Sequence, residues 1–212
     1  MNPDFWHARW QQDQIGFHQQ EINMHLQDYW PLPDLEPGCG VFVPLCGKSR
    51  DMLWLLSRGY RVLGVEISPI AVQGFFEEHG LEPRITRRGR FESWACEDLE
   101  ILCGDFFHLT PGDLAGVRAV YDRASLVALP PAMRGDYVTQ LARLLAAGAS
   151  VLLVSMEYPD HEMQGPPFSV TEREVESLYQ PAFQVNLLAS VDILKENDNL
   201  RRKGLSQMQE KV

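Results

Sequence analysis

The stretch VFVPLCGKSRDMLWLLSRGYRVLGVEISPIAVQGFF, residues 41–76, alternates short apolar runs with longer amphipathic segments. Its first run, 41–45, is short and apolar, which is typical of a buried parallel strand. A helix is predicted over 48–59 because leucine and methionine side chains recur on one face and Gly59 is a typical end. A second strand is predicted over 60–68. It leads into another helix at 68–80, where serine and proline are typical starting residues.

The same alternation continues toward the carboxyl end of the chain. Further strands are predicted over 99–107, 117–125 and 150–158, and further helices over 130–148 and 171–179. Two last strands, 184–193 and 207–212, have no helical pattern between them, so we expect them to form an antiparallel edge. Strands that alternate with helices predict an α/β fold with a doubly wound, mostly parallel sheet.

The N-terminal region has a different character from the rest of the chain. Two short helices are predicted over about 4–13 and 19–30, joined by a turn at Gly16-Phe17-His18 and followed by a Pro/Gly-rich break at 31–40. No repeat or linker divides the remaining residues. We therefore expect a single domain over residues 1–212, with an N-terminal helical lid at about 1–30.

Composition excludes several classes of protein. Of 212 residues, 45% are hydrophobic and 23% charged, and 19 basic against 29 acidic residues give a formal charge of -10. A net negative chain disfavours nucleic acid as a partner. The apolar runs are too short to span a membrane, and the N-terminus MNPDFWHARW lacks the apolar core of a signal peptide. We expect a cytoplasmic protein.

The four cysteines do not predict a metal site. Cys39 and Cys46, and likewise Cys96 and Cys103, are seven residues apart, which does not match the spacing of zinc ligands. Free thiols in a reducing compartment are the simpler interpretation, and no metal is expected.

Two glycine patterns resemble nucleotide-binding motifs but fail in detail. Gly47-Lys48-Ser49 lacks the glycine that a phosphate-binding loop needs five residues earlier, where Phe42 stands. Gly38-Cys39-Gly40 lacks the third glycine of a dinucleotide fingerprint and precedes the strand that it should follow. Neither pattern predicts a bound phosphate.

A different set of polar residues follows the predicted strands. Glu66 lies 19 residues after Gly47, near the distance at which a strand-end carboxylate can accept both hydroxyl groups of a ribose. Asp105 and the pair Asp122-Arg123 are expected on the same rim, because carboxyl ends of parallel strands meet at one edge. Arg123 is expected to be partly buried and therefore to need a partner.

Four longer stretches resemble one protein family. They are the opening stretch 41–76, YDRASLVALPPAMRGDYV (121–138), GPPFSV (165–170) and FWHARWQQDQIGFHQQEIN (5–23). Together they closely resemble the thiopurine S-methyltransferase family, in particular its bacterial members. The stretch PLCGKS carries most weight, since it replaces the glycine-rich loop common in methyltransferases.

This resemblance implies a class I S-adenosylmethionine-dependent methyltransferase with a Rossmann-like seven-strand sheet and a reversed edge strand. S-Adenosyl-L-methionine would be the cofactor, with Trp10, Leu45, Glu66 and Arg123 as its contacts. Phe17 and Arg123 would contact the acceptor, and the loop over 156–170 would form another wall of its site. No residue is assigned as catalytic.

The implied reaction is methylation of aromatic or heterocyclic thiols such as thiopurines, extending to selenium or tellurium compounds, in a detoxifying role. The resemblance implies a monomer acting on a small-molecule thiol. Two alternatives stay open on the residues alone: a nicotinamide-dependent oxidoreductase of Rossmann type, and a non-enzymatic module that binds an adenosyl ligand. Trp6 and Trp10 are also spaced as a core stripe, without any ligand.

Overall fold

The computed structural model describes residues 3–16, 18–30, 35–195, 201 and 204–212. These residues fall into two compact units. The first unit is Met1–Tyr121 with Leu144–Leu152, and the second is Asp122–Arg143 with Leu153–Val212. Phe17 lies outside the described residues.

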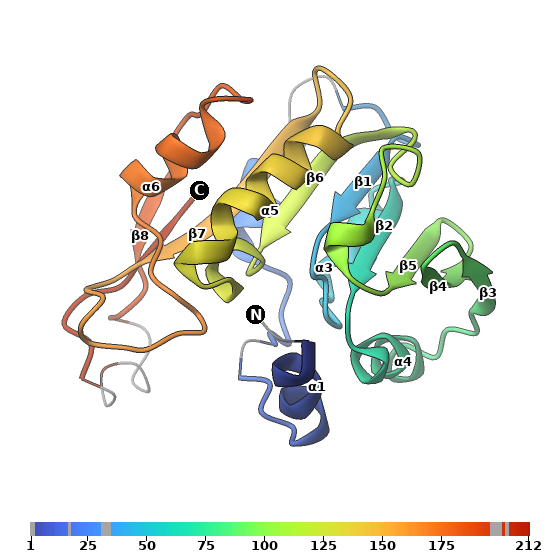
Figure 1. The fold of residues 1–212 in the computed structure, drawn as a ribbon, viewed down its shortest axis with the longest axis horizontal. Helices are drawn as coiled ribbons and strands as arrows, with labels where there is room; N and C mark the ends of the chain where they lie inside the picture. Colours follow the sequence, from blue (N-terminus) through green and yellow to red (C-terminus); the bar gives the residue numbers. More distant parts are fainter. Residues whose placement is uncertain (1–2, 17, 31–34, 196–200, 202–203) are drawn as a thin grey trace. The chain divides into compact units, whose positions relative to one another are not determined.

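The first unit contains a sheet whose strands run in the order β3-β4-β5-β2-β1-β6-β7 (Figure 1). Their bounds are β1 Gly40–Val43, β2 Arg61–Glu66, β3 Arg84–Arg88, β4 Phe91–Cys96, β5 Leu99–Cys103, β6 Val117–Arg123 and β7 Ser150–Glu157. Strand β1 pairs in parallel with β2 and β6, and β2 pairs in parallel with β5. This parallel centre confirms the predicted fold class.

The hairpin of β3 and β4 was not predicted, so the described residues form nine strands instead of seven. Strand β4 is antiparallel to both β3 and β5. The sequence of β3, RITRR, is almost entirely exposed and therefore carries no apolar alternation. A strand that buries neither face gives no hydrophobic pattern to detect.

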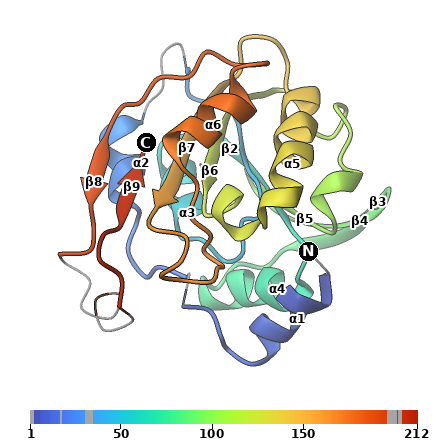
Figure 2. The same ribbon diagram turned by 60° about the vertical axis from the view of Figure 1, so that its left-hand side comes forward.

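The described helices of the first unit are α1 Pro3–Gln11, α2 Met24–Tyr29, α3 Asp51–Ser57, α4 Pro69–Glu78 and the 3-10 helix η1 Phe106–His108. Capping side chains start three of them, α2, α4 and η1. Ser68 caps α4 as predicted, accepting from the Ala71 N–H. The prediction of a helix from residue 19 was wrong, because the Asn23 side chain caps α2 and accepts from the His25 and Leu26 amides. Helix α1 lies beside α4 in both views (Figures 1 and 2).

The predicted strand over 99–107 is also too long. Strand β5 ends at Cys103, and the Gly104 N–H donates to the Glu66 carbonyl. Asp105 then accepts from the Phe107 N–H and starts η1. Asp105 therefore follows the strand instead of lying within it.

The second unit holds the ends of β6 and β7 together with the remaining elements. These are η2 Leu126–Ala128, α5 Pro131–Leu144 up to Arg143, α6 Glu172–Tyr179, β8 Ser190–Asp192 and β9 Gln209–Lys211. Strand β9 is antiparallel to both β7 and β8, which confirms the predicted antiparallel edge. Only three residues of the strand predicted over 184–193 are regular, and Leu187 and Leu188 are about half exposed.

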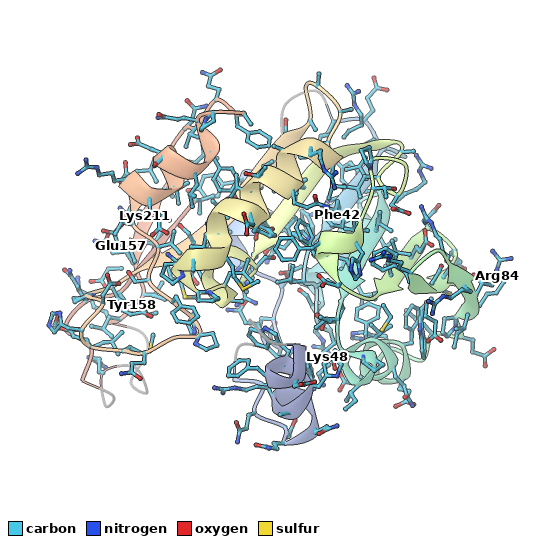
Figure 3. All side chains as sticks on the ribbon, viewed as in Figure 1. Phe42, Lys48, Arg84, Glu157, Tyr158 and Lys211 are labelled. Atoms are coloured by element: carbon cyan, nitrogen blue, oxygen red, sulfur yellow. The ribbon has the colours of Figure 1, made fainter. Side chains whose placement is uncertain are left out.

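An apolar cluster and an ion-pair network hold the second unit together. Tyr158, Leu194, Leu205 and Met208 form the cluster. The Lys211 ammonium lies 2.8 Å from Glu157, and both residues are labelled in Figure 3. It also lies 2.9 Å from Glu172. Burial alone would lower the pKa of Lys211, but its hydrogen bonds to the two carboxylates raise it. None of the described helices has the length and hydropathy needed to cross a membrane.

Candidate functional site

The turn after β1 is fastened to the carboxyl end of β2. The Gly47 N–H donates to Glu66 Oε2 over 2.9 Å, and the Ser68 N–H donates to Oε1 over 2.8 Å. One residue earlier in the turn, the Cys46 N–H donates to the Val65 carbonyl over 3.0 Å. The Glu66 carboxylate is therefore held from two sides by backbone groups.

Burial gives this carboxylate unusual electrostatics. Glu66 is only 6% exposed. Loss of solvent raises its pKa above the ordinary value, and the amides of Ser68, Gly47 and Ile67 oppose that rise by hydrogen bonding. A carboxylate has about four acceptor positions, so these three amides leave about one for a further donor. A hydroxyl group, such as one of a ribose, fits this capacity.

The backbone of the turn is in the left-handed region at two places. Leu45 has φ 45° and Gly47 has φ 52°. A bulky non-glycine residue rarely adopts this conformation, and such outliers cluster at functional sites. Leu45 therefore marks the turn as a place where backbone geometry is enforced by its surroundings.

Trp10 lies against the same turn. A Cβ atom added to Gly47 would come 3.2 Å from Trp10 Cζ2, so any larger residue at this position would press on the indole. Trp10 is 8% exposed, as a core residue would be, but it is buried against the turn. The interpretations of Trp10 as a packing residue and as a cover for the turn are compatible.

Asp51 was not singled out in the sequence, although it anchors the N-terminal segment next to this turn. It is 3% exposed and accepts from the Asn23 N–H and the Tyr121 hydroxyl, each over 2.9 Å. Arg50 adds a bond to the Gln20 carbonyl over 2.7 Å. An acidic residue in the first turn of a predicted helix was the available signal, but it indicates helix stabilisation and not a distant partner.

In the second unit, Arg123 is the last residue of β6 and is partly buried, as predicted. The expectation that Asp122 opens on the rim was wrong, because its side chain is fully buried. The Tyr137 hydroxyl donates to Asp122 Oδ2 over 2.6 Å, and the Tyr179 hydroxyl donates over 3.4 Å. Burial raises the pKa of Asp122, and hydrogen bonds, that of Tyr137 first among them, partly oppose the rise. Asp122 is thus an anchor next to Arg123 on β6.

The structure brings three of the predicted cofactor contacts together. Trp10, Leu45 and Glu66 all meet at the turn after β1 in the first unit. Arg123 belongs to the second unit, and its role stays a prediction. Phe17 lies outside the described residues, so its role also stays a prediction.

Several solved structures with the same fold are methyltransferases. A 1,6-didemethyltoxoflavin-N1-methyltransferase from Burkholderia thailandensis, solved with S-adenosylhomocysteine, has a TM-score of 0.59 at 14% identity, covering 99% of this chain and 85% of that chain. A SAM-dependent methyltransferase from Methanosarcina mazei has a TM-score of 0.60 at 15% identity, covering 91% and 96%. These similarities confirm the predicted class I methyltransferase fold.

Sequence relatives extend the comparison from fold to family. The thiopurine S-methyltransferases of Nitrosospira multiformis and Methylococcus capsulatus are 49% and 50% identical to this chain, covering all of it and 96% of each relative. The family model described as Thiopurine S-methyltransferase (TPMT) matches residues 1–212. These findings favour the methyltransferase over the oxidoreductase and the non-enzymatic module. The chain belongs to the thiopurine S-methyltransferase family of enzymes.

Proposed function

We propose that this protein transfers a methyl group from S-adenosylmethionine to the thiol of a small aromatic or heterocyclic acceptor. The observation that carries the proposal is the buried Glu66 carboxylate at the carboxyl end of β2, held by Gly47 and Ser68 with acceptor capacity left for a ligand. Ligands of doubly wound sheets bind at this edge.

The described residues fit the cofactor. Glu66 would accept from the ribose hydroxyl groups, and the left-handed backbone at Leu45 would approach the methionine part. Trp10, buried against Gly47, would cover the ligand and exclude water. When bound, S-adenosylmethionine supplies a methyl group on a positively charged sulfur. These roles are proposals that rest on the geometry of the turn and on family membership.

The protein's own contribution to the reaction is positioning. An acidic heteroaromatic thiol is largely ionised near neutral pH, so methyl transfer to it requires no proton transfer by a side chain. Holding two reactants in line contributes about 7–11 kcal/mol to lowering a barrier. Exclusion of water strengthens the attraction between opposite charges, which Trp10 would support.

Arg123 and Phe17 are proposed as acceptor contacts. An arginine at the end of β6 would pair with an anionic thiolate, and its anchor Asp122 would fix the backbone from which it projects. An aromatic ring at position 17 would stack on a planar heterocycle. Selenium and tellurium nucleophiles are soft in the same sense as thiolates, so they belong to the proposed acceptor class.

The experiment combines binding and turnover. Calorimetric titration with S-adenosylmethionine and S-adenosylhomocysteine should show one site per chain. A panel of thiopurine, thiophenol, aliphatic thiol and selenol acceptors should then yield S- or Se-methylated products by mass spectrometry. Binding of S-adenosylhomocysteine without methylation of any acceptor would contradict the proposal, as would binding of NADH in its place.

We also propose a single-domain cytoplasmic monomer with the N-terminal helices as its lid. The four cysteines are all free, which agrees with a reducing compartment. The bonds of Asn23 and Gln20 to the start of α3 give the N-terminal segment a fixed attachment beside the turn. Sedimentation analysis tests the monomer, and cooperative unfolding in one transition tests the single domain.

A further inference from the structure

Arg134 on α5 is a buried guanidinium in the second unit. It is 2% exposed and is one of the largest fully buried side chains of the described chain. Its Nη2 atom is buried and has no hydrogen-bond partner among the described residues. A buried donor without a partner is destabilising, and an apolar side chain of similar length would avoid that loss. The contacts of its other atoms must therefore explain why a guanidinium is buried here.

Those atoms join three separate segments. Nε donates to the Leu129 carbonyl over 3.0 Å, at the end of η2. Nη1 donates to Glu174 on α6 over 2.6 Å and forms an ion pair with it. The guanidinium carbon lies 6.0 Å from the centre of the Phe168 ring, within the range of a cation–π contact. A planar fork can make these contacts together, whereas a lysine ammonium cannot.

The loop that carries Phe168 is fixed along its length. The Phe168 N–H donates to the Val127 carbonyl over 2.7 Å, and the Val170 N–H donates to the Met156 carbonyl over 2.7 Å. The Tyr158 hydroxyl donates to the Pro167 carbonyl over 2.5 Å. A Cβ atom at Gly165 would collide with Phe168 Cγ, so only glycine admits the ring there. The Phe168 ring therefore has one defined place.

The segments that meet at Arg134 come from a functional edge of the sheet. Val127 and Leu129 follow the carboxyl end of β6, and the loop with Phe168 follows the carboxyl end of β7. Ligands of such sheets bind beyond the carboxyl ends of the parallel strands, so these segments lie at the edge where a ligand is expected. An aromatic ring fixed at this edge is suited to contact a planar acceptor.

We propose that Arg134 is a positioning residue for the methyl acceptor. It holds the Phe168 ring and the loop at 165–170 against η2 and α6, and the ring in turn contacts the acceptor. Arg134 itself acts through Phe168 and does not take part in methyl transfer. This inference rests on the proposed function, since it assigns the loop to the acceptor of that reaction.

The test separates acceptor binding from cofactor binding in the full chain. Arg134→Met and Phe168→Leu should each raise the KM for an aromatic thiol on the order of tenfold, the scale of a small misplacement. Affinity for S-adenosylhomocysteine should stay within about twofold, because neither residue belongs to the turn after β1. Arg134→Lys should raise the KM less than Arg134→Met does, because it keeps the charge but loses the planar fork. The double variant should have about the same KM as either single variant, since each substitution removes the same contact between Arg134 and Phe168.

Leu141→Ala is the matched control, because Leu141 is fully buried on the same helix, seven residues after Arg134, and lies outside the loop. It should lower Tm but leave the thiol KM unchanged. The proposal is overturned if Arg134→Met and Leu141→Ala shift KM, kcat and cofactor affinity in the same proportions. If Arg134→Met does not fold, the variants Glu174→Gln and Arg134→Lys provide the test. An unchanged thiol KM in both of them overturns the proposal.

Failure of the proposed function gives a different result. A wild-type chain that binds S-adenosylhomocysteine but methylates no acceptor contradicts the proposed function and, with it, the acceptor role of the ring. Whether Arg134 positions the loop is then tested by amide exchange at Phe168 and Val170, whose N–H groups fasten the loop. Faster exchange in Arg134→Lys than in wild type supports Arg134 as the group that positions the loop, and equal exchange overturns it.

Discussion

The backbone N–H of Gly47 donates to the carboxylate of Glu66 over 2.9 Å, across 19 residues of sequence. This bond fixes the turn after β1 to the end of β2, the two places from which cofactor contacts are proposed. The turn also has little room for a larger residue at Gly47, since Trp10 covers this glycine. A ligand held by Glu66 would therefore lie next to the turn and its tryptophan.

Replacing Glu66 by alanine should weaken S-adenosylhomocysteine binding by about 2–3 kcal/mol, the range for charge-assisted hydrogen bonds to a ligand. Isothermal calorimetry gives the difference directly. Glu100→Ala is the control, because Glu100 makes an ion pair with Arg88 near the start of β5 and lies away from the turn. Equal losses of affinity in the two variants would refute the role of Glu66.

Binding of S-adenosylhomocysteine should slow amide exchange in α1 and in the turn at 45–47. Trp10 packs on Gly47, so a ligand that orders the turn also orders the helix that covers it. Hydrogen exchange with mass spectrometry measures the effect, with α6 as the internal reference. Protection that is the same with and without ligand would mean that α1 is only part of the core.

Arg123→Ala should lower turnover of an anionic thiol much more than affinity for S-adenosylhomocysteine. An arginine repels a cationic sulfonium and attracts a thiolate, so its removal should act mainly on the acceptor. A neutral selenide or thioether acceptor should lose less rate than the thiolate. Parallel losses of product affinity and of rate with both acceptors would make Arg123 a cofactor or structural residue instead.

Ala124→Gly should raise the free energy of unfolding by about 0.5–1 kcal/mol, because Ala124 has a left-handed backbone that glycine adopts without strain. Urea denaturation provides the measurement. Ala128→Gly, four residues later in η2, should change stability in the opposite direction, since no positive φ occurs there. Destabilisation by both substitutions would show that position 124 is not strained.

The contribution of Asp122 to stability should fall as pH rises through the acidic range. Burial raises the pKa of Asp122 in the folded state, so the folded chain binds that proton more tightly than the unfolded chain. The stabilisation is fully present below the ordinary carboxyl pKa and is lost as pH rises through the raised value. Asp122→Asn should remove this part of the slope, since its amide oxygen can still accept from Tyr137. If the free energies of unfolding of parent and variant depend on pH in the same way, Asp122 does not make this contribution.

Features that depend on residues close together in the sequence were predicted correctly. Ser68 predicted the start of α4, and Gly59 and Gly80 have the positive φ expected of residues that end helices. The parallel centre was predicted because its strands are buried on both faces and so read as continuous apolar runs. Glu66 was identified by its distance from Gly47 along the chain, and the two residues are in contact.

The errors lie where a contact outside the segment itself decides. The arginine-rich β3 becomes a strand only because β4 supplies its hydrogen bonds. Asp122 and Arg123 are neighbours in sequence, but the tyrosines of α5 and α6 bury the first while the second stays partly exposed. Because side chains alternate in direction along a strand, the sequence indicates that the two residues point to opposite faces, but it does not indicate which of them α5 and α6 cover.

By itself, the sequence determined the α/β class, the family and the position of the cofactor turn, because period, capping and motif spacing are local properties of the chain. Only the tertiary structure decided that Trp10 covers Gly47, that Asp51 anchors the N-terminal segment and that Arg134 joins three segments at one guanidinium. Each of these depends on side chains far apart in sequence that become neighbours only when the core is packed, and burial then fixes their partners and their charge.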